Sequence, residues 1–92
     1  MSNLVTEAGT PVNISASALI ASGSGQILGI FVASASSTPT IKVWGQVSAN
    51  APVIVNTFIP VAATYYKIPA AFTKGLFVTI SGTVDCTVFW TP

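Results

Sequence analysis

Few side chains in this sequence could carry out chemistry, and they do not combine into a known catalytic set. The chain has no histidine and one cysteine, Cys86, so neither a Ser-His-Asp nor a Cys-His arrangement can form. One thiol and two carboxylates without an imidazole are also too few to build a zinc site. The sequence therefore predicts a protein that is not an enzyme, with no catalytic residues, no metal site and no cofactor.

The two carboxylates, Glu7 and Asp85, allow two weaker hypotheses, an acid–base pair and a calcium site at Asp85. Neither is favoured, because Glu7 falls in an expected terminal arm and no cluster of Asp and Asn residues surrounds Asp85. Cys86 lies on the apolar side of its expected strand, so it is interpreted as a small core residue. The three lysines, which are spread along the chain, are interpreted as solvated charges.

Two short motifs invite a functional interpretation. The glycine-rich run at residues 23–29 has the spacing G-x-G-x-x-x-G and leads into a strand, so it lacks the spacing and the helix of a dinucleotide-binding loop. It is expected to form a turn. The adjacent Tyr65 and Tyr66 could stack on a sugar, but the sequence places no acid or amide cluster beside them. Packing in the core or in an interface is the favoured role of both tyrosines.

Charge and hydropathy argue against two classes of partner. The net charge is +1 and there is no arginine, which argues against binding to nucleic acid. The longest apolar run, residues 27–33, is far shorter than the roughly 20 residues of a membrane-spanning helix. The first residues lack the basic and apolar segments of a signal peptide, so we expect a protein that is made in the cytoplasm and used without secretion, with no membrane partner.

Turn-forming residues set the expected fold. Proline and glycine recur so often that no three-turn helix fits between them, and the intervening segments are rich in Val, Ile, Thr, Phe and Tyr. Strands are predicted at 11–15, 17–21, 26–34, 40–46, 52–59, 64–68, 75–81 and 84–90. This pattern predicts an all-β fold, a small antiparallel two-sheet sandwich that is jelly-roll-like, with an immunoglobulin-like sandwich as the alternative. Residues 11–92 would form this single domain, and residues 1–10 a flexible N-terminal arm that reaches a neighbouring copy or another partner.

Apolar residues are expected on both faces of several strands. Because successive side chains alternate, Trp44 shares a face with Lys42, and Phe89 shares a face with Asp85. In strand 52–59, alternation places Val53 inward. The residues expected to face outward, which form the candidate interface, are Trp44, Ile54, Phe58, Phe77 and Phe89. Only five of 92 residues are charged, and interfaces are depleted in charge, so we expect these faces to be covered in an oligomer.

The second half of the chain resembles small β-sandwich proteins of tailed bacteriophages. The resemblance spans roughly residues 26–90 and rests on the strand and turn pattern of three stretches. These are TIKVW at 40–44 with VIVNTFIP at 53–60, YYKIPAAF at 65–72, and GLFVTISGTVDCTVF at 75–89.

The resemblance implies a structural virion protein of the capsid decoration or cement type. Such a protein would bind the major capsid protein between capsomers, on the outer surface of the phage head, as a homotrimer. Two alternatives stay open: a head-fibre or tail-associated protein, and a carbohydrate-binding or adhesin module. The first would occur in few copies per particle, and the second would need exposed aromatic rings beside hydrogen-bonding side chains.

Overall fold

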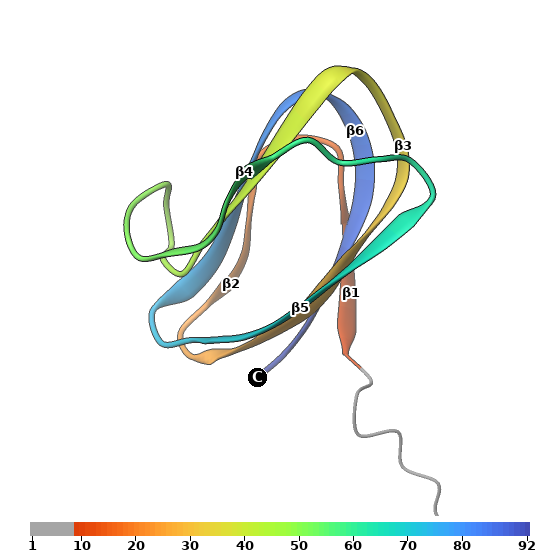
Figure 1. Cartoon of the computed structure of the whole chain (residues 1–92). Helices are drawn as coiled ribbons and strands as arrows, with labels where there is room; N and C mark the ends of the chain where they lie inside the picture. Colours follow the sequence, from red (N-terminus) through yellow and green to blue (C-terminus); the bar gives the residue numbers. More distant parts are fainter. Residues whose placement is uncertain (1–8) are drawn as a thin grey trace, which may run out of the picture.

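The computed structural model describes residues 9–92, which form an all-β, antiparallel fold (Figure 1). The strands are β1 (Thr10–Ile14), β2 (Ala18–Ser22), β3 (Gly25–Trp44), β4 (Val53–Phe58), β5 (Thr64–Phe72) and β6 (Gly75–Thr91). These residues contain no helix, and therefore none that could span a membrane. The hypothesised arm at residues 1–10 lies outside the described residues except for Gly9 and Thr10, and Thr10 already pairs with Trp90 as the first residue of β1.

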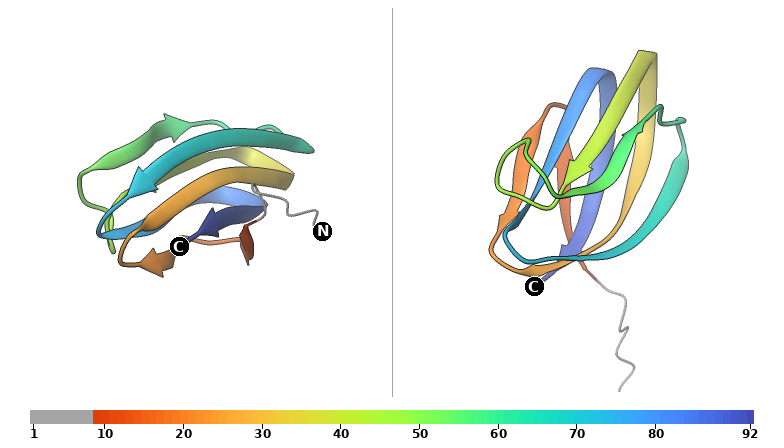
Figure 2. Two further views of the ribbon diagram at one scale, coloured as in Figure 1. Left: turned by 90° about the horizontal axis from the view of Figure 1, so that it is seen from below. Right: turned by 60° about the vertical axis from the view of Figure 1, so that its left-hand side comes forward.

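Two long strands organise the fold. The predicted strands 26–34 and 40–46 fall on the single strand β3, which ends at Trp44, and the predicted strands 75–81 and 84–90 are parts of the single strand β6. β3 and β6 pair with each other along most of their length and bend together, as both views in Figure 2 show. Because each long strand passes through the bend, it contributes one half to each of two layers.

The bend has a local cause in both strands. The register between β3 and β6 shifts between the pairs Ser36–Thr83 and Thr40–Ser81, so three residues of β3 lie opposite Gly82 alone. Gly82 has φ +83°, and Thr38 has φ 47°. An extra segment opposite a left-handed glycine is a β-bulge, which bends and twists a strand without ending it. The turn signals at Pro39 and Gly82 therefore mark a corner rather than two loops.

The strand order is that of a jelly roll. Layer 1 contains β1, residues 83–91 of β6, residues 25–36 of β3, and β5, in that order across the layer. Layer 2 contains β2, residues 75–81 of β6, residues 40–44 of β3, and β4. β1 and β2 thus lie in different layers, whereas the first two strands of an immunoglobulin-like sandwich are neighbours in one sheet. The jelly-roll prediction is confirmed.

The core lies between the two layers and consists of apolar side chains. Alternation along β6 is confirmed, because Leu76, Val78, Val84, Cys86 and Val88 are all buried. A second set of buried residues comes from β3 and the remaining strands: Ile14, Ala21, Ile27, Ile30, Val32, Ile41, Val43 and Phe72. Among the side chains whose burial the structure describes, no polar or charged one belongs to the core, but the indole Nε1 of the partly buried Trp90 is enclosed without a hydrogen-bond partner. The core is thus an apolar layer between two sheets, whose outer faces point in opposite directions.

Candidate functional site

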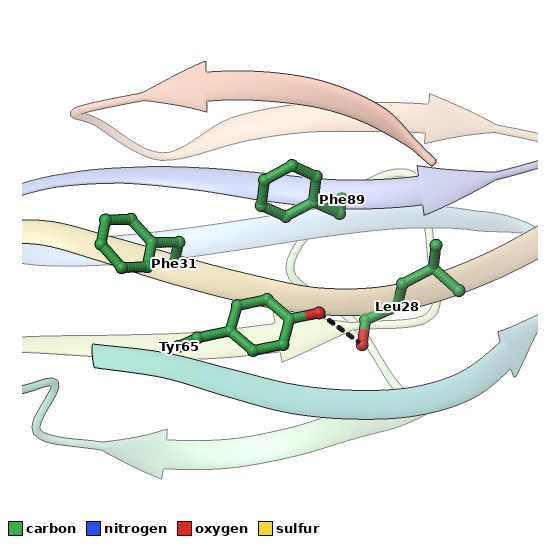
Figure 3. Close-up of a pocket in the computed structure, with 4 residues that line it drawn as sticks. All are labelled: Leu28, Phe31, Tyr65 and Phe89. Atoms are coloured by element: carbon green, nitrogen blue, oxygen red, sulfur yellow. Dashed lines mark hydrogen bonds between the residues drawn. The ribbon is translucent and has the colours of Figure 1, made fainter. Parts of the chain in front are cut away.

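The outer face of layer 1 carries a cluster of exposed and half-buried apolar side chains around Tyr65. Leu28, Phe31, Tyr65 and Phe89 line a shallow hollow of about 380 Å³ there, and we call these four residues the Tyr65 face (Figure 3). They come from β3, β5 and β6. Phe31 is 39% exposed and Tyr65 is 49% exposed. Large apolar groups left open on a sheet face are typical of interaction surfaces.

Gly29 explains how Tyr65 lies flat on this face. The ring of Tyr65 crosses β3 directly over Gly29, where a Cβ atom would meet the ring and the Tyr66 carbonyl oxygen. The Tyr65 hydroxyl donates a hydrogen bond to the Leu28 carbonyl at 3.4 Å, drawn in Figure 3. The ring centroids of Tyr65 and Phe89 are 6.2 Å apart at 67°, an edge-to-face contact. A glycine within an apolar run therefore makes room for an aromatic side chain from the neighbouring strand.

A polar group borders the aromatic rings on the β1 side. The register places Asn13, Thr87, Phe31 and Tyr65 in one row across layer 1. The Asn13 side-chain amide donates to the Asp85 carboxylate at 2.8 Å and to the Cys86 carbonyl at 3.0 Å. Amide, carboxylate and aromatic groups are therefore held together on one surface.

The outer face of layer 2 carries a second apolar cluster. Leu19 pairs with Phe77, Phe77 with Trp44, and Trp44 with Val53, so the four side chains form a row across β2, β6, β3 and β4. We call these residues the Trp44 face. Leu19 is 49% exposed and Val53 is 43% exposed, whereas Trp44 and Phe77 are half-buried. The row spans the width of the layer.

Trp44 is held in place on its face by two polar neighbours. Its indole Nε1 donates to Thr79 Oγ1 at 3.3 Å. The Lys42 ammonium lies 4.2 Å from the centroid of the Trp44 ring, a cation–π contact. The prediction that Lys42 and Trp44 share a face is confirmed.

The structure separates the five predicted interface residues. Trp44 and Phe77 belong to the Trp44 face, and Phe89 belongs to the Tyr65 face. Ile54 and Phe58 instead pack against the core. The prediction that these last two residues face outward is wrong.

The inward assignment of Val53 is wrong as well, because Val53 is exposed. The register between β3 and β4 shifts on both sides of Val43, so strict alternation along β4 does not hold. Phe58 packs against Tyr66 with ring centroids 5.1 Å apart.

Leu28 and Phe31 were not among the predicted interface residues. Both lie in a run that is apolar on both faces, and a register shift at residues 27–29 decides which side each one takes. The signal that could have found them is Gly29, because glycine inside a strand marks a bulge or a close approach by another group.

Cys86 is a core residue, as predicted. Its side chain has no exposed surface. Burial, with a smaller contribution from the negative charge of Asp85, raises the pKa of the Cys86 thiol to about 11. The thiol is therefore protonated at neutral pH, and the reactive species of a cysteine is the thiolate. This position has the properties of a packing residue.

Chemically, the described residues offer surfaces for association. Residues 9–92 contain no group of three His, Cys, Asp or Glu side chains that could hold a metal ion. Both outer faces combine exposed apolar groups with few charges, and they point in opposite directions because they belong to opposite layers. No family model matches this chain, and no curated protein and no solved structure matches it either.

Proposed function

We propose that the protein is a structural virion component, a decoration or cement protein that binds the major capsid protein on the outside of a phage head as a homotrimer. The observation that carries the proposal is the presence of an apolar cluster on both outer faces of one small sandwich. A monomer needs neither cluster for its fold, because its core lies between the layers. A protein that binds between capsomers needs one apolar surface for contact with its own copies and another for contact with the capsid.

The sparse charge supports the same function. Five charged residues in 92 leave little electrostatic repulsion between copies and little cost of removing charges from water at a contact. A trimer presents each capsid-binding surface three times. Weak individual contacts then add up through effective concentration, because the second and third contacts form within one complex.

The test is binding of the purified protein to expanded empty heads that lack it. We expect saturable binding at many equivalent sites, visible as added density in electron cryomicroscopy, and decorated heads that withstand a higher temperature than bare heads. A matched variant is Leu19→Ser on the Trp44 face, where Leu19 is 49% exposed, with Ile59→Ser in a loop as the control, since Ile59 is also exposed, at 60%. Folded wild-type protein that leaves the heads bare would contradict the proposal, and binding at only a few sites per head would favour a head-fibre role.

A second candidate function is binding of a saccharide on the Tyr65 face. It is favoured by the row of Asn13, Thr87, Phe31 and Tyr65, which places exposed rings beside an amide and a hydroxyl. Sugars bind to such surfaces through stacking and directional hydrogen bonds. A glycan array distinguishes the two functions: specific retention of a glycan supports the saccharide, and its absence together with binding to heads supports the virion role.

A further inference from the structure

The Tyr65 face has one negative and one positive charge at opposite ends. Asp85 is exposed on β6, where its register partner is Ser34 of β3. Lys67 is exposed on β5, where its register partner is Gly29 of β3. The two partners are five positions apart along β3, which corresponds to roughly 16 Å of strand. Phe31 lies between these two positions of β3, with Tyr65 as its register partner on β5.

Both charges belong to the surface of this face. The Asp85 carboxylate is oriented through its Oδ1 atom, which accepts the hydrogen bond from Asn13 at 2.8 Å. Lys67 lines the neighbouring hollow together with Leu28, Tyr65 and Pro69. A carboxylate, an apolar centre and an ammonium group therefore follow one another across a single face.

The Trp44 face has a different charge pattern. Its charged residue among those described is Lys42, which lies over the Trp44 ring. Two Trp44 faces in contact would bring two ammonium groups together, and like charges at a contact are unfavourable. The Tyr65 face can instead pair its negative end with the positive end of another copy.

Contact between the Tyr65 face of one copy and the Trp44 face of the next would not produce a closed trimer. The two faces belong to opposite layers, so such contacts would repeat in a stack, and contacts that do not close generate open assemblies. A closed ring of three copies needs both of its contact surfaces on the same side of each subunit. The β5 side and the β6 side of the Tyr65 face both lie on the outer surface of layer 1.

We infer that the Tyr65 face is the contact between subunits, with Asp85 of one copy opposite Lys67 of the next. The inference rests on the proposed function, which supplies the homotrimer. Each Tyr65 face points toward the three-fold axis. Its β6 side, with Asp85 and Phe89, packs on the β5 side of the neighbouring copy, with Tyr65 and Lys67. The Trp44 face then points away from the axis and stays open for a partner of different composition, the capsid.

Charge reversal at the two ends tests this contact. The variants are Asp85→Lys, Lys67→Asp and the double variant, with Lys74→Asp as the control because Lys74 lies in an exposed loop at the end of the sandwich. Each single reversal changes three contacts per trimer from attractive to repulsive. We expect the protein concentration at half-dissociation, measured by sedimentation at low salt, to rise about tenfold for each single variant.

The double variant restores the pairing and should return that concentration to within about threefold of the wild type. Lys67→Asp removes no hydrogen bond observed among the described side chains, so it remains a valid test if Asp85→Lys disturbs the fold by losing its bond to Asn13. Single variants that dissociate no more readily than Lys74→Asp would overturn the inference and leave the proposed function intact. Restoration in the double variant with a dimer mass would support the contact and contradict the homotrimer.

Discussion

Replacement of Ile30 by alanine is expected to lower the free energy of unfolding by about 2–5 kcal/mol. Ile30 has no exposed surface and lies in the middle of layer 1, where β3 pairs with β5 through Tyr66 and with β6 through Val88. Removal of three carbon atoms there costs their transfer out of water and leaves a cavity between two layers. A domain of this size typically has a total stability of about 5–15 kcal/mol, so the change is a large fraction of it.

The matched control is Ile59→Ala, since Ile59 is the same residue type at 60% exposure. Its expected effect is within about 0.5 kcal/mol. Urea unfolding at one fixed protein concentration measures both variants, because self-association would make stability depend on concentration. Equal midpoints for the two alanine variants would mean that the core does not lie between the layers.

Replacement of Gly82 by alanine is expected to destabilise the protein by about 2–5 kcal/mol, the sum of two costs. The first is the left-handed backbone of Gly82, at φ +83°, which a side chain disfavours. The second is steric, because a Cβ at Gly82 would lie 2.8 Å from the Cα of Pro39. Pro39 is buried at the corner where β3 and β6 bend together, so the backbone has little room to move away.

Gly23 provides the control for this position. It has φ +88°, but a Cβ there would meet nothing within 4 Å. Gly23→Ala should therefore show only the backbone cost, about 1–2 kcal/mol. The difference between the two urea midpoints isolates the contact at the corner, and the absence of any difference would show that the corner tolerates a side chain.

The fold class was predictable because its signals are local. Turn residues separated segments of high β propensity, and alternation along β6 placed Leu76, Val78, Val84 and Val88 correctly in the core. β6 is paired along both of its edges, with β3 on one edge and with β1 or β2 on the other. Because it lies inside both layers, one of its faces points to the core along its whole length. In such a strand the period of two in the sequence corresponds directly to the inner and outer faces.

Alternation failed where the register shifts. Shifts on both sides of Val43 displace β4, and a further shift at residues 27–29 separates Leu28 from the strict pattern. A shift depends on pairing between segments far apart in the sequence, and the sequence of one strand does not contain its partner's position. The same reason explains why β3 and β6 were each predicted as two strands: Pro39 and Gly82 signal a bend, but only the pairing shows that the strand continues through it.

The candidate site was predictable in kind but only partly in position. Apolar residues on the same face as a charged residue correctly indicated Trp44 and Phe89 as surface groups. The sequence favours packing over sugar stacking for Tyr65, but the place of its ring over Gly29 depends on a neighbouring strand. The separation of the apolar surface into two opposite faces follows from the layer each segment joins, which is a property of the topology and not of any single strand.

The solution mass of the purified protein tests the central claim most directly, because the account requires that its apolar outer faces associate. Light scattering on a sizing column measures that mass independently of shape. We predict a stable species near three times the 9.4 kDa chain mass. A single, well-behaved species at 9.4 kDa over the whole accessible concentration range would contradict self-association through these faces.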